Sequence, residues 1–133
     1  PQIRLRQGAH VRSAVANRLG QETTVHWHGL RVPNAMDGVP HLTQPPIAAH
    51  GGRFIYEFDL PDAGTYWYHP HQANPEQISR GLYGALIVEE RDSPRVDRDL
   101  VWVLSDWRLD REARIVENFG VSCQHPFTPD GDK

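Results

Sequence analysis

Four of the eight histidines form two pairs in which a single residue separates the members: His26 with His28, and His69 with His71. In a β-strand, residues i and i+2 project from the same face about 6.5–7 Å apart, so each pair can present two imidazoles to one metal centre. Imidazole suits Cu, Zn, Fe and Ni, and its unperturbed pKa of about 6.5 leaves it largely neutral at neutral pH. The spacing therefore permits a transition-metal site.

Spacing alone leaves a second interpretation open, in which these are surface or hydrogen-bonded histidines. With 8 His in 133 residues, chance supplies about 0.47 His-x-His pairs, so the pairs need support from their surroundings. The surroundings are three segments: Thr24–Leu30 (TVHWHGL), Met36–Pro40 (MDGVP) and Gly64–His71 (GTYWYHPH).

In their order, spacing and flanking residues, these segments resemble the first domain of three-domain multicopper oxidases of the laccase-like and copper-resistance type. The resemblance extends from about Ile3 to Arg108. It implies that His26 binds the type 2 copper of a trinuclear cluster that reduces dioxygen to water. The type 3 copper pair of that cluster would be bound by His28, His69 and His71.

The resemblance also implies an oxidoreductase with copper as its cofactor and with a phenol or a metal ion as its small reducing substrate. Asp37 matches a family carboxylate that assists proton delivery near the cluster, although an Asp-Gly turn by itself also accounts for this residue. A periplasmic or secreted location is expected from the family, and no signal peptide is visible in the chain.

The family takes its type 1 copper site and four more cluster histidines from the last domain. Cys123 could form a blue-copper set with His125 and Met36, but Ser122-Cys123-Gln124 is not the His-Cys-His segment of the family. We therefore expect the remaining cupredoxin domains of the same protein to be partners of this chain, and we expect the chain alone to be inactive.

Two alternatives stay open. One is a metal-free, degenerate cupredoxin domain that serves as a scaffold or assembly protein, although such relatives usually lose the ligand histidines. The other is a domain of a two-domain, trimeric copper oxidase. The Trp-rich flanks and the loop at Met36–Gly38 look more like the three-domain enzymes.

The elements that must position the histidines are predicted to be short strands. Eleven Gly and 11 Pro are spread along the chain, which favours many short elements joined by turns. Arg31–Pro46 is predicted to be a loop, and Gln72–Arg80 a helical turn or a loop. Strands are predicted over Ile3–Arg6 and His10–Asn17, as a pair, and over Thr23–Leu30, Arg53–Leu60, Thr65–His69, Gly81–Glu89 and Asp99–Ser105.

This pattern predicts an all-β fold, and the resemblance makes it a cupredoxin-like Greek-key sandwich or barrel over residues 1–110 that lacks its first strand. Residues 111–133 are predicted to be a weakly structured tail or the start of an interdomain connection. Trp27 and Trp67 are expected to serve in packing. The remaining histidines are expected to be solvated: His10, His41, His50 and His125.

Composition excludes several other classes of function. The net charge is -3 and Lys and Arg are scattered, so the chain has no basic stripe for nucleic acid. Its longest apolar runs fall far short of the roughly 20 residues that span a bilayer, so we expect no membrane segment. The single cysteine, Cys123, excludes an internal disulfide.

Overall fold

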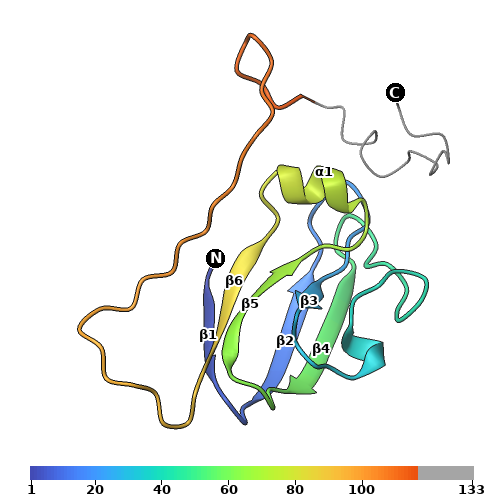
Figure 1. Ribbon diagram of the computed structural model, residues 1–133. Coiled ribbons are helices and arrows are strands. Elements are labelled where there is room, and N and C mark those ends of the chain that lie inside the picture. The colour runs from blue at the N-terminus through green and yellow to red at the C-terminus, as the bar shows by residue number, and fades with distance from the viewer. Residues whose placement is uncertain (117–133) are drawn as a thin grey trace, which may run out of the picture.

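The computed structural model describes residues 1–116, which form two β-sheets that share an apolar core (Figure 1). One sheet has four strands in the order β1-β6-β5-β3, and the other pairs β2 with β4. The predicted all-β sandwich is thereby confirmed. In chain order the elements are β1 (Ile3–Arg6), β2 (His10–Ala16), β3 (His26–His28), the 3-10 helix η1 (Asn34–Met36), β4 (Arg53–Asp59), β5 (Gly64–His69), α1 (Asn74–Ser79) and β6 (Gly84–Glu89).

The core lies between the sheets and is built from the alternating positions of their strands. In β4, every second residue is withdrawn from solvent, as the sequence predicted. Trp27 of β3 packs edge-on against Tyr56 and Phe58 of β4, with ring centroids 5.4 and 5.1 Å apart. This packing fixes β3 against the opposite sheet. The fully buried cluster comprises Trp27, Ile47, Tyr56, Phe58, Leu60, Leu86 and Val88.

The first two strands do not pair with each other, so that prediction was wrong. β1 runs parallel to β6 and β2 runs antiparallel to β4. Gly8, with φ +86°, turns the chain from one sheet to the other, and its amide donates to the Leu60 carbonyl at 2.7 Å. Alternation identifies a strand but not its partner, because partners are chosen by contacts distant in the sequence.

The strand predicted over Asp99–Ser105 is also wrong. This segment leaves the sandwich in an extended path (orange in Figure 1) and makes no backbone hydrogen bond to the described strands. A strand requires a neighbour to satisfy its backbone groups, which an apolar run alone does not supply. Asp99, at the start of the segment, pairs with Arg4 at 2.7 Å, and just beyond its end the indole of Trp107 donates to the Ser79 carbonyl at 3.1 Å.

Most of the predicted tail, 111–133, lies outside the described residues, and its boundary at residue 110 stays a prediction. Within 1–116, no helix combines the length and the apolar composition needed to cross a bilayer.

Candidate metal centre

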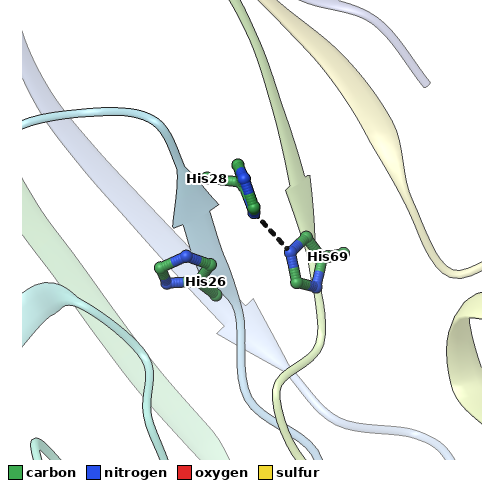
Figure 2. A group of neighbouring side chains, drawn as sticks. All are labelled: His26, His28 and His69. Atoms are coloured by element: carbon green, nitrogen blue, oxygen red, sulfur yellow. Dashed lines mark hydrogen bonds between the residues drawn. The ribbon is translucent and has the colours of Figure 1, made fainter. Parts of the chain in front are cut away.

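Three of the four predicted ligands meet where β3 lies beside β5. The antiparallel register sets His26 opposite His69 and His28 opposite Trp67. Because alternate residues share a face, both histidines of β3 point to the same side as His69 (Figure 2). One ring nitrogen from each of the three lies within 4.8 Å of those of the other two.

The fourth predicted ligand, His71, lies beside this group but not within it. Pro70 follows the last residue of β5, so His71 stands on irregular chain rather than on the strand. Its ring centroid lies 5.4 Å from that of His26 and 6.4 Å from that of His69. The structure therefore brings all four imidazoles to one region.

Backbone carbonyls orient two of the rings. Nδ1 of His26 lies 2.7 Å from the Asp37 carbonyl oxygen, and Nδ1 of His69 lies 2.8 Å from that of Pro70. A carbonyl only accepts, so each Nδ1 carries the proton and each Nε2 keeps a free lone pair. A hydrogen bond from the ring nitrogen that does not bind the metal is the arrangement that fixes the tautomer of a metal-binding histidine.

The imidazole of His28 faces that of His69 directly. Nδ1 of His28 lies 3.2 Å from Nε2 of His69, as the dashed line in Figure 2 shows. Since Nε2 of His69 has no proton, Nδ1 of His28 must donate in this state. In the other neutral tautomer of His28, with the proton on Nε2 instead, both nitrogens would direct lone pairs at the same space. Converging neutral imidazoles are a donor set that suits copper, so the residues present fit the cofactor that was predicted.

The environment of His69 favours the neutral form that a metal requires. Burial lowers the pKa of the His69 imidazole, and its histidine neighbours lower that pKa further, while the hydrogen bond to the Pro70 carbonyl opposes the shift. The side chain therefore resists protonation, which would otherwise compete with metal binding.

Trp27 and Trp67 pack on opposite faces of this sheet. Trp27 is buried in the core, as expected. Trp67 instead stacks on His69, with ring centroids 4.1 Å apart and planes inclined by 29°, and lies 4.9 Å from the ring of His28. Its indole thus forms a wall against two predicted ligands.

Asp37 caps the C-terminus of η1 and reaches the centre with two groups. Its carbonyl oxygen orients His26, as described above, and Oδ1 of its carboxylate lies 3.4 Å from the same Nδ1. The carboxylate is about one-third exposed, at 34%. It is therefore in contact with both solvent and His26.

The other described histidines stand apart from this centre. His41 and His50 are exposed. His10 is also exposed, but it is held by Asp59 at 2.7 Å and Glu57 at 3.1 Å rather than by solvent alone.

Of the alternative blue-copper set of Met36, Cys123 and His125, the described residues include Met36 alone. The Met36 sulfur accepts the amide of Glu57 at 3.3 Å. Cys123 and His125 lie outside the described residues.

The sequence did not point to two groups that support the centre. One is the Pro70 carbonyl, which carries no side-chain signal. The other is Thr24, whose hydroxyl accepts the amide of His71 at 3.1 Å. Its position two residues before His26 is a signal that could have indicated it, because i and i+2 share a face in a strand.

Comparisons with known proteins agree with this geometry. The family model described as multicopper oxidase matches residues 1–93. A Copper resistance protein A homolog of Pseudomonas syringae pv. tomato is 39% identical over 88% of this chain and 20% of its own length. The Multicopper oxidase MmcO of Mycobacterium tuberculosis is 42% identical over 80% of this chain and 21% of its own length.

Solved structures show the same fold. The crystal structure of Lac15 from a marine microbial metagenome is similar over 87% of this chain and 30% of that chain, with 48% identity and a TM-score of 0.80. A multi-copper oxidase from Pseudomonas thermotolerans matches 69% of this chain and 22% of that chain, with 48% identity and a TM-score of 0.67. The predicted cupredoxin-like fold is confirmed. The chain, which spans about a fifth of the length of the curated relatives described above, belongs to the multicopper oxidase family.

Proposed function

We propose that this chain is the first domain of a multicopper oxidase and supplies four ligands to a trinuclear copper cluster that reduces dioxygen to water. The observation that carries the proposal is the convergence of the ring nitrogens of His26, His28 and His69 within 4.8 Å on two paired strands. Because the chain covers about a fifth of its relatives, the remaining cupredoxin domains supply the other ligands and the electron-entry site.

The four ligands divide between two kinds of copper. His26 is assigned to the type 2 ion on the strength of the family resemblance; its Nδ1 is held by the Asp37 carbonyl at 2.7 Å and takes no part in the contact between His28 and His69. His28, His69 and His71 are assigned to the type 3 pair. The 3.2 Å approach of Nδ1 of His28 to Nε2 of His69 supports placing these two ligands at the same part of the cluster.

Copper bound there would supply the electrons that reduce dioxygen. The protein residues orient the ligands and move protons. The carbonyls of Asp37 and Pro70 hold two imidazoles with Nε2 directed into the centre. The Asp37 carboxylate, partly exposed and 3.4 Å from Nδ1 of His26, is positioned to take protons from water and pass them toward the centre.

The reducing substrate is a phenol or a metal ion that is oxidised at the type 1 site of the complete protein. We place that protein in the periplasm or outside the cell. Both proposals rest on the family resemblance.

The test is the copper content of the full-length protein, with His28→Ala combined with His69→Ala as the variant. Loss of cluster copper and of oxygen consumption is expected, because two of the three converging imidazoles are removed. His41→Ala serves as the control, since His41 is exposed and lies outside the centre. Wild-type copper content in the double variant would overturn the ligand assignment, whereas absence of copper from the wild-type protein would favour a metal-free scaffold.

A further inference from the structure

His71 is the predicted ligand whose position the sheets do not determine. β5 ends at His69, and α1 begins only at Asn74, so His71 lies on a short connection between them. Connections of this kind move more readily than the strands they join. A ligand on such a connection needs an anchor of its own to hold its imidazole beside the other three.

The backbone of His71 has one such anchor among the described residues. Its amide donates to Oγ1 of Thr24 at 3.1 Å. Thr24 is 1% exposed and stands two residues before His26. A single buried hydroxyl therefore links the approach to β3, which carries the first histidine pair, to the second member of the other pair.

A second anchor lies on the far side of the connection. Gln77 of α1 is 1% exposed, and its Oε1 accepts the Thr23 hydroxyl at 2.7 Å. Its Nε2 donates to the Glu22 carbonyl at 2.8 Å. The side-chain amide group of Gln77 thus links α1, the helix after His71, to the two residues directly before Thr24.

Buried polar groups are costly unless they are paired, and a satisfied buried network holds one arrangement of the chain. Here the paired groups lie on both sides of His71. Thr24 accepts the backbone amide of His71, and Gln77 fixes α1, which follows His71 in the chain. Thr23, Thr24 and Gln77 are not among the proposed copper ligands. They therefore act through the position of His71 rather than on the reacting atoms.

We infer that Thr24 and Gln77 are positioning residues for His71, and that they set the distance between its imidazole and those of His26 and His69. This inference rests on the proposed function. It adds that the copper affinity of the cluster depends on two buried polar side chains that bind no metal. Removal of partners that orient ligands typically costs about 10- to 100-fold in metal affinity or activity.

The decisive variant is Thr24→Val in the full-length protein, which keeps the shape of the side chain but removes the acceptor. Thr24→Ser restores the hydroxyl, and Thr65→Val is the matched control on the exposed face of β5. Three quantities are measured: the affinity for copper, the electron paramagnetic resonance spectrum of the loaded protein, and hydrogen exchange of the His71 amide in the copper-free protein.

Thr24→Val is expected to weaken copper binding about 10- to 100-fold, to alter the spectrum and to speed exchange at His71. Thr24→Ser should restore all three. Thr65→Val should leave them unchanged. Wild-type affinity, spectrum and exchange in Thr24→Val would overturn the inference while leaving the proposed function intact. Absence of cluster copper in the wild-type protein would overturn the proposed function itself.

Gln77→Met is the second variant and keeps the test decisive if Thr24→Val does not fold. It preserves the length of the side chain but loses both hydrogen bonds. Weaker copper binding with an altered spectrum supports the inference. A folded Gln77→Met protein with wild-type affinity and wild-type exchange at His71 contradicts it.

Discussion

Nδ1 of His28 lies 3.2 Å from Nε2 of His69, across a sequence separation of 41 residues. The contact exists because β3 and β5 pair in a register that sets His28 opposite Trp67, which lies two residues before His69 and on the same face of β5. A shift of one residue in that register would turn the histidines of one strand to the opposite face. The geometry of the candidate metal centre therefore depends on strand pairing as much as on the histidines.

Asp37→Asn should separate proton supply from copper binding. The backbone carbonyl that orients His26 remains in this variant, while the carboxylate is lost. Copper content should stay at the wild-type level, and oxygen reduction should slow by about 100-fold or more, the usual scale for a lost general acid or base. Steady-state oxygen uptake and copper analysis of the same preparation provide the measurement. Equal turnover in the two proteins would assign Asp37 to the turn alone.

Trp67→Ala should weaken copper binding without unfolding the sandwich. Its indole stacks on His69 at 4.1 Å and contacts His28, and it is not part of the buried core. Aromatic contacts of this kind contribute about 0.5–1.5 kcal/mol, which corresponds to an affinity about 2- to 12-fold lower. Copper titration measures the effect. Trp67→Phe keeps a ring and should recover part of the loss, whereas identical affinities for all three proteins would contradict a role for the stack.

Gly38→Ala should destabilise the protein more than a positive φ alone explains. Gly38 has φ +79°, and a Cβ placed there would overlap the carbonyl oxygen of Val25, directly before His26. Gly81→Ala is the matched control, because Gly81 has φ +93° with no atom near the added Cβ. The control should cost about 1–2 kcal/mol, the usual penalty for a left-handed residue.

Urea unfolding of both glycine variants makes the comparison. Gly38→Ala should exceed the control and should also lower the copper content, since the backbone at His26 must shift. Equal losses of stability would show that the contact with Val25 relaxes freely.

His10 should titrate above its ordinary range. The hydrogen bonds that the His10 imidazole donates to Asp59 and, to a smaller extent, to Glu57 raise its pKa. A raised pKa in the folded state means that this stabilisation is fully present below the unfolded value of about 6.5 and is lost as pH rises through the folded value. The gap in unfolding free energy between wild type and His10→Gln should therefore be larger at about pH 5.5 than at about pH 9.

Nuclear magnetic resonance of histidine-labelled protein follows the titration directly. Asp59→Asn should lower the pKa of His10 toward its ordinary value, because it removes the largest cause of the shift. Asp99→Asn removes a carboxylate that pairs with Arg4 and should leave the titration unchanged. A pKa of His10 that does not respond to Asp59→Asn would refute the pairing.

The sequence by itself determined the class of fold and the identity of the ligand candidates. Alternation is a local property, so the strand from Arg53 and its buried face could be predicted correctly. The two His-x-His pairs indicated a possible transition-metal site, because side-chain chemistry and i, i+2 spacing are written directly in the chain, and the resemblance of their flanking segments to multicopper oxidases implied copper.

Only the tertiary structure decided which strands are partners and which groups hold the ligands. β1 and β2 entered different sheets, and Asp99–Ser105 formed no strand, because pairing depends on backbone groups supplied by distant residues. The contacts of His69 with Pro70 and of His71 with Thr24 likewise depend on the folded path of the backbone. The local sequence shows which side-chain atoms can bind a metal. The directions in which these atoms point are set by contacts that exist only once the two sheets have packed.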